Sequence, residues 1–91
     1  MTQTLTLADT LDMTAAAPLC RDLLAHRGQP VRLDGSQVRR IGGQCLQVLL
    51  SAQTTWAGDD LAFEIIDPTD EFTDGLTLLG SPGLVAAPDQ D

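Results

Sequence analysis

The chain of 91 residues lacks lysine and tyrosine altogether, and its aromatic residues are two phenylalanines and one tryptophan. Leucine, valine, isoleucine and alanine must therefore build the core. Hydrophobic residues make up 43% of the sequence and charged residues 20%, which is typical of a folded domain rather than of a disordered chain. The length favours a single domain over residues 1–91, with an ordered core over about 4–80 and a flexible tail over 81–91.

Cysteine and histidine are equally scarce. Cys20 and Cys45 lie far apart and His26 is the single histidine, so the closely spaced ligand pairs of a zinc site are missing. We expect both cysteines to be buried small side chains in helices, and His26 to interact with the C-terminal end of the first helix. Neither a hydrolase triad nor a phosphate-binding loop is present. The sequence thus predicts no enzyme, no metal and no cofactor.

Long apolar segments are absent as well. No run approaches the ~20 residues of a membrane span, and the N-terminal "MTQTLTLADTLDMT" has no basic region ahead of an apolar one. We therefore expect a soluble cytoplasmic domain without direct membrane insertion.

Basic residues are confined to the first half of the chain. Up to residue 45, five arginines face four aspartates, whereas residues 46–91 hold nine carboxylates and no base, and the formal net charge is −8. This polarity argues against nucleic acid and anionic membranes as partners, and favours a basic partner surface if the acidic half binds anything. Acidic loops that only keep a small domain soluble explain the pattern equally well.

Hydrophobic periodicity predicts three strands that alternate with three helices. The strands are expected at residues 4–7, 30–34 and 61–66, and the helices at about 14–28, at about 43–56 and around the stripe of Phe72, Leu76 and Leu79. This β-α-β-α-β-α order predicts an α/β fold, in which helices cover a small sheet that is parallel in its βαβ parts.

Three local expectations follow from individual residues. Pro18 should lie in the first turn of its helix, where a missing N–H costs least. Gly75 inside the last helix should cost about 1 kcal/mol relative to alanine and make that helix the least secure element. Asp67 and Asp70 form a plausible capping pair for this helix, in competition with Thr69.

The loop before the central helix carries residues suited to contact a partner. Val38 and Ile41 are expected to anchor it to the core, while Arg39 and Arg40 point to water. The helix then starts at the segment 42–44, where backbone N–H groups are free to bind an anion or a partner.

This helix start consists of Gly42, Gly43 and Gln44. Two glycines allow a partner's backbone to approach closely, and the Gln44 amide both donates and accepts hydrogen bonds. The alternative is that the glycines only let the loop enter the helix.

The segment "VRLDGSQVRRIGGQCLQVLLSAQ" resembles the core signature of STAS domains, the fold of the anti-sigma-factor antagonists. That signature is a strand ending in Leu-Asp, a short loop with Val and Ile anchors, and a helix. The resemblance continues through "DPTDEFTDGLTLLG" and covers about residues 5–80. The matching positions in the signature are Leu33, Asp34, Val38, Ile41 and Leu46.

One departure from the family pattern affects regulation. In the phosphorylated antagonists the helix begins Asp-Ser-Ser-Gly, and a partner kinase phosphorylates the second serine. Here Gln44 stands at that position and cannot accept phosphate, so no phosphorylation is expected there. Ser36 lies earlier in the loop and Ser51 two turns into the helix, and neither replaces it.

The fuller pattern, "LDGSQVRRIGGQCLQVLLSA" followed by "DPTDEF", is most similar to small STAS proteins associated with alphaproteobacterial chemotaxis systems. This resemblance implies a partner of the chemotaxis histidine kinase or its response regulator that tunes phosphate flow between them. The implied contact residues are Val38, Arg39, Arg40, Gly42, Gly43 and Gln44.

Three alternatives remain open from the sequence. A phospho-independent anti-sigma factor antagonist would use the same loop. A lipid-transport accessory subunit would bind an ABC-transporter ATPase, although that type usually carries Asp-Thr where this chain has Gly42 and Gly43. The third alternative is a purely structural module that dimerises through a helical surface.

Overall fold

The computed structural model describes residues 3–80, and the expected tail over 81–91 lies outside the described residues. The predicted alternation of strands and helices is confirmed, with two additional short strands, β2 and β4. The elements are β1 (Gln3–Thr6), β2 (Thr10–Leu11), α1 (Met13–Ala25), β3 (Val31–Asp34), β4 (Arg40–Ile41), α2 (Gly43–Gly58), β5 (Phe63–Ile66) and α3 (Asp70–Leu78).

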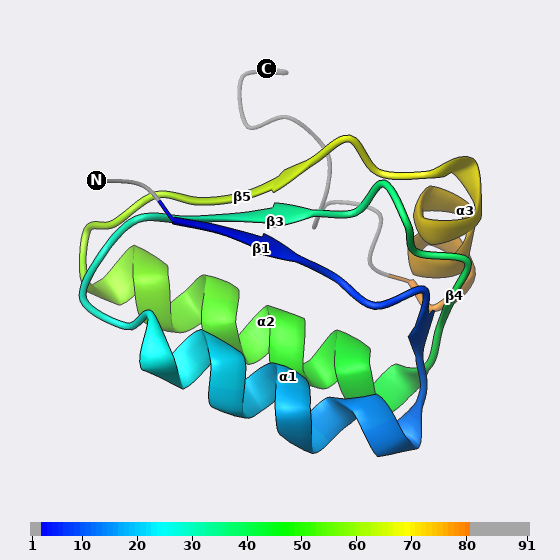
Figure 1. Cartoon of the computed structure of the whole chain (residues 1–91), viewed down its shortest axis with the longest axis horizontal. Helices are drawn as coiled ribbons and strands as arrows, with labels where there is room; N and C mark the ends of the chain where they lie inside the picture. Colours follow the sequence, from blue (N-terminus) through cyan, green and yellow to red (C-terminus); the bar gives the residue numbers. More distant parts are fainter. Residues whose placement is uncertain (1–2, 81–91) are drawn as a thin grey trace.

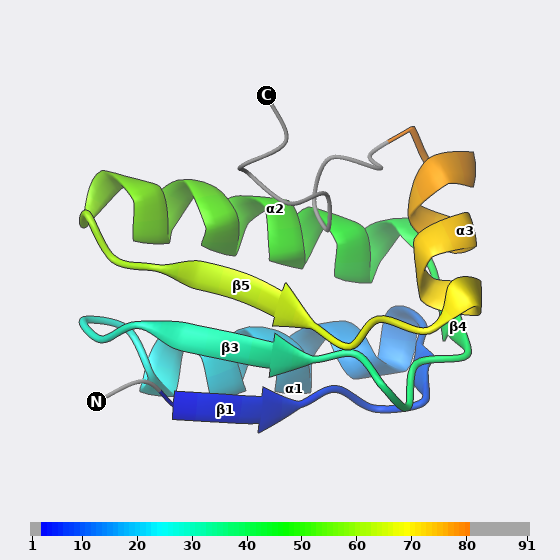
Figure 2. The same ribbon diagram turned by 90° about the horizontal axis from the view of Figure 1, so that it is seen from above.

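The main sheet has the strand order β1-β3-β5, and both neighbouring pairs are parallel. Helices α1 and α2 lie side by side on one face of this sheet, as expected for βαβ connections (Figure 1). The three strands point in the same direction, so their carboxyl ends meet at one end of the sheet. Figure 2 shows β4, α3 and the start of α2 gathered at that end.

The core lies between the sheet and the two long helices. Val31 and Leu33 of β3 are fully buried and pack with buried leucines of α1 and α2. The intervening Arg32 is exposed and lies 3.2 Å from the carboxylate of Glu64, on the sheet face opposite the helices. This alternation of buried and exposed residues is the pattern of a sheet with one apolar face.

Helix α1 begins earlier than the sequence indicated. The Asp12 carboxylate accepts hydrogen bonds from the backbone N–H groups of Thr14 (3.0 Å) and Ala15 (3.3 Å), which is the geometry of an N-cap. Pro18 therefore lies in the second turn, and its predicted place in the first turn was wrong. Because proline has no N–H, the Thr14 carbonyl lacks its usual helical donor.

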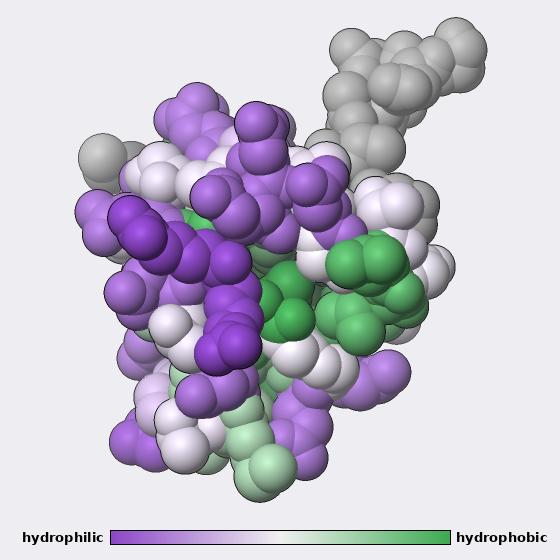
Figure 3. Space-filling model, turned by 90° about the vertical axis from the view of Figure 1, so that its right-hand side faces the viewer, coloured by the Kyte–Doolittle hydropathy of each residue, from purple (hydrophilic) through white to green (hydrophobic). Residues whose placement is uncertain are grey.

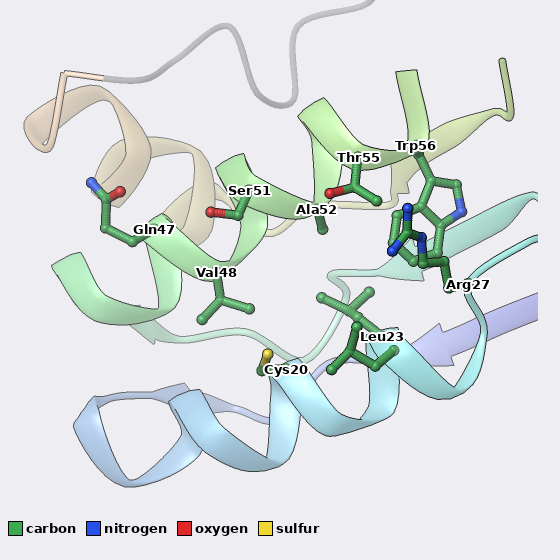
Figure 4. A pocket seen from close by; sticks show the side chains of 10 residues that line it. Cys20, Leu23, Arg27, Gln47, Val48, Ser51, Ala52, Thr55 and Trp56 are labelled. Atoms are coloured by element: carbon green, nitrogen blue, oxygen red, sulfur yellow. The ribbon is translucent and has the colours of Figure 1, made fainter. Parts of the chain in front are cut away.

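The two cysteines differ in environment. Cys45 is buried as predicted, but Cys20 is exposed, so the prediction that both are buried was wrong for Cys20. Cys20 lies one position beyond the buried Leu19 and lines a groove between α1 and α2, together with Val48 (Figure 4). His26 lies at the end of α1 as expected, with its Nδ1 2.9 Å from the Asp22 carbonyl oxygen.

None of the helices within residues 3–80 is long and apolar enough to span a membrane. The same residues contain no cluster of three or more potential metal ligands.

Candidate partner-binding surface

The loop from residue 38 to residue 44 is fixed by a second, two-stranded parallel sheet, which pairs β2 with β4. The Asp9 carbonyl accepts hydrogen bonds from the N–H groups of Arg39 (2.7 Å) and Arg40 (3.2 Å), and the Gly42 N–H donates to the Leu11 carbonyl at 2.9 Å. These bonds hold the loop on both sides of β4. The predicted site is therefore a rigid surface at the carboxyl end of the main sheet, where binding sites of α/β folds commonly lie.

Val38 anchors this loop to the hydrophobic core, as the sequence predicted. Its side chain is completely buried, and its carbonyl accepts a hydrogen bond from the hydroxyl of Thr69. The same hydroxyl caps α3 by accepting from the Phe72 N–H at 3.0 Å, so Thr69 is the N-cap that competed with Asp67 and Asp70. Val38 thus supports the loop from within the core, and its side chain is not exposed on the predicted contact surface.

The other predicted residues lie at the surface. Arg39, Arg40, Gly43 and Gln44 are exposed, and Gly42 is half-buried. Within residues 3–80, ion pairs join Arg27 to Asp59 and Arg32 to Glu64, and neither Arg39 nor Arg40 takes part in one. Both arginines therefore lack an ion pair within the described residues, and each can bind a carboxylate outside the chain.

The start of α2 adds backbone donors beside these arginines. Its N-cap is Gly42, which provides no side-chain cap, and the first turn contains no acidic residue. The first N–H groups of a helix have no partner within the helix and carry its positive end. A Cβ at Gly43 would meet nothing within 4 Å, and one at Gly42 would meet only the Leu11 carbonyl oxygen, at 3.7 Å. Packing inside the described residues therefore does not require either glycine.

The Leu-Asp-Gly turn that opens the loop has a clear structural role. The Asp34 carboxylate accepts a hydrogen bond from the Ser36 N–H at 2.9 Å, and the hydrogen bonds from Ser36 lower the pKa of Asp34. Gly35 is buried against α3, and a Cβ there would lie 2.8 Å from the ring of Phe72 and 3.3 Å from the Cα of Pro68. Only glycine allows the loop to pass this close to α3.

A close approach also joins α3 to β4. A Cβ at Gly75 would lie 2.7 Å from Cγ2 of Ile41. Gly75 therefore permits the contact between this helix and the loop of residues 38–44. The sequence predicts that Gly75 lies inside the last helix, and the structure confirms this. The reason for a glycine at this position becomes clear only from its contact with Ile41.

Several residues of this surface were not predicted. Asp9, Gln37, Ser36 and Glu71 line a shallow polar depression together with Arg39 and Thr69. Asp9 precedes β2 and Glu71 lies in the first turn of α3, so the fold brings them to the loop from distant parts of the chain. No local pattern in the sequence indicates this grouping.

Cys45 lies at the beginning of α2, where a thiol is often activated by the helix. Here its Sγ donates a hydrogen bond to the Asp12 carbonyl at 3.2 Å. Burial, and secondly the nearby Asp12 carboxylate, raise the pKa of the Cys45 thiol. The thiol is therefore a structural link between the two helix starts and is a poor nucleophile.

A family model described as "Mlab, STAS domain" matches residues 1–86, which is nearly the whole chain. The chain belongs to the STAS domain family. The small parallel sheet and three helices agree with that assignment. Comparison with curated proteins and with solved structures gave no significant match.

Proposed function

We propose that this STAS domain is a non-enzymatic regulatory module that binds a histidine-kinase-type signalling protein and tunes phosphate flow in a chemotaxis pathway, in the cytoplasm. Family membership supports a regulatory module of the anti-sigma-factor-antagonist kind. The observation that carries the proposal is the exposed pair Arg39 and Arg40, without ion pairs inside residues 3–80, beside an uncapped helix start. The backbone bonds around β4 hold these groups in place before binding, which reduces the entropy lost on association.

Binding in this proposal does not depend on a phosphate at the start of α2. Gln44 occupies the position of the family's phosphoserine, is exposed and cannot accept phosphate. Its amide can donate to and accept from a partner at the same time. Binding would then be regulated by the concentrations of this domain and of its partner, and by the state of each protein.

Calorimetry with the purified chemotaxis histidine kinase of the same organism tests the proposal. The variant that combines Arg39→Glu with Gln44→Ala should bind at least about 10-fold more weakly, because it reverses one contact charge and removes an amide. Both side chains are exposed, so the domain should remain folded. The matched control is Arg21→Glu, which reverses an exposed charge on α1. Equal affinity of the double variant and the wild type would contradict the proposed site.

The pathway requires a separate experiment. Tagged protein should be purified from the native cytoplasm and its bound proteins identified by mass spectrometry. Recovery of a chemotaxis kinase or its response regulator is the expected result. Recovery of an anti-sigma factor or a transporter ATPase would retain the STAS fold and replace the pathway.

A further inference from the structure

The partner-binding surface is bordered by an exposed apolar side chain. Leu78, the last residue of α3, is 87% exposed, the largest value among the large hydrophobic residues of 3–80. The neighbouring Leu79 is 41% exposed. Leu78 therefore contributes little to the core, and together with Leu79 it forms an exposed apolar spot at the end of α3.

The geometry of α3 places Leu78 next to the loop. Glu71, Gly75 and Leu78 follow each other at helical spacings of four and three residues, so they form one stripe along α3. Glu71 lines the polar depression with Arg39, and Gly75 lies against Ile41 of β4. The stripe therefore runs along the loop, and Leu78 lies one turn beyond the contact between Gly75 and Ile41.

Figure 3 shows this end of the molecule as a hydrophobic patch beside a strongly hydrophilic one. Apolar and polar groups also lie next to each other in protein interfaces, where an apolar core is bordered by a polar rim. Apolar side chains at the centre of an interface supply much of the affinity, while charges at the rim guide the encounter.

We propose that the binding surface extends from Arg39 and Arg40 across Ile41 to Leu78, and that it receives an apolar side chain of the partner with carboxylates at its side. This inference rests on the proposed function and adds the chemistry of the partner's surface. The apolar side chain packs on Leu78 and the exposed part of Ile41. The carboxylates lie against the arginines and the uncapped start of α2.

The charges around the loop favour a carboxylate near Arg40 in particular. Asp9 and Glu71 share the depression with Arg39 and partly balance its charge. Arg40 lies in β4, two residues before the N-cap of α2, whose first turn contains no acid. A partner carboxylate at this point therefore meets a guanidinium group and helical N–H groups together.

A second apolar surface provides the control. A groove between α1 and α2 is lined by Leu23, Val48, Ala52 and the 61%-exposed Leu24, and lies on the helical side of the molecule (Figure 4). Leu24 is thus an exposed leucine like Leu78, although less exposed (61% against 87%), and it lies in a helix that does not carry the loop of residues 38–44.

The test compares Leu78→Ser, Leu24→Ser and the double variant Arg39→Gln/Arg40→Gln in calorimetry with the purified chemotaxis histidine kinase, at low and high salt. Leu78→Ser should weaken binding about 10-fold at both salt concentrations. Leu24→Ser should change affinity less than about 2-fold. The arginine variant should weaken binding and lose most of the salt dependence seen with the wild type.

Each other outcome has a distinct meaning. If the wild type does not bind, the proposed function fails and this inference with it. If the arginine variant binds weakly but Leu78→Ser binds normally, only the inference fails. A lower melting temperature of Leu78→Ser with normal affinity would show that Leu78 packs on its own chain. Conversion of a wild-type dimer to a monomer by Leu78→Ser, seen in analytical ultracentrifugation, would assign Leu78 to a second copy.

Discussion

Replacement of Gly75 by alanine sets two effects of known size against each other. Alanine is favoured over glycine in a helix interior by about 1 kcal/mol. The added methyl group would lie 2.7 Å from Cγ2 of Ile41, well inside van der Waals contact. Overpacking of this kind costs about 1–3 kcal/mol. Because Ile41 is branched at Cβ, its χ1 angle cannot relax easily, and α3 must move away from β4 instead.

We therefore expect Gly75→Ala to lower the free energy of unfolding by about 1 kcal/mol, the difference between a clash of about 2 and a helical gain of about 1. Urea denaturation followed by Trp56 fluorescence measures this, since the single tryptophan is 2% exposed in the folded chain. Ile41→Ala removes the methyl group that clashes, so Gly75→Ala should become stabilising in that background. A stabilisation of about 1 kcal/mol by Gly75→Ala alone would refute the contact between α3 and β4.

Three further predictions concern the frame of the surface. Gly35→Ala should destabilise the fold by about 2 kcal/mol in urea denaturation, because the ring of Phe72 is fully buried and cannot move aside; an unchanged midpoint would contradict this packing. Thr69→Ala should lower the free energy of unfolding by about 1–2 kcal/mol, because the N-cap and the hydrogen bond to Val38 are both lost. Thr69→Ser keeps the hydroxyl and should retain most of this stability. Equal losses in the two variants would contradict the role of the hydroxyl. Hydrogen bonding, mainly from the Thr14 hydroxyl, lowers the folded-state pKa of Asp12 below its ordinary 3.8. Its stabilising contribution is therefore present above pH 3.8 and lost as the pH falls further. Asp12→Asn should make the melting temperature depend less on pH in that acidic range, and an unchanged dependence would exclude this role.

The sequence predicts the main elements of the fold because their signals are local. The stripe of Cys45, Leu49, Ala52 and Trp56 indicates α2 without any tertiary information, and all four side chains are buried. The loop between β3 and α2 was likewise predictable, since glycines and paired arginines interrupt the hydrophobic pattern there.

Other features depend on contacts between distant residues. Strands β2 and β4 have two residues each, too few for a periodic signal, and exist because the Asp9 and Leu11 carbonyls face the loop. Glu71 comes to lie beside Arg39 only because α3 packs on β4, where Gly75 closely approaches Ile41. The position of Pro18 was misjudged because the cap formed by Asp12 starts the helix at Met13, a full turn before the proline.

Hydrogen exchange of the domain, alone and saturated with the purified chemotaxis kinase, tests the binding surface most directly. Our account predicts that binding slows exchange at the amides of Gly43 and Gln44, in the first turn of α2, and around Leu78. Slower exchange confined to the groove between α1 and α2, with residues 39–44 unchanged, would contradict it.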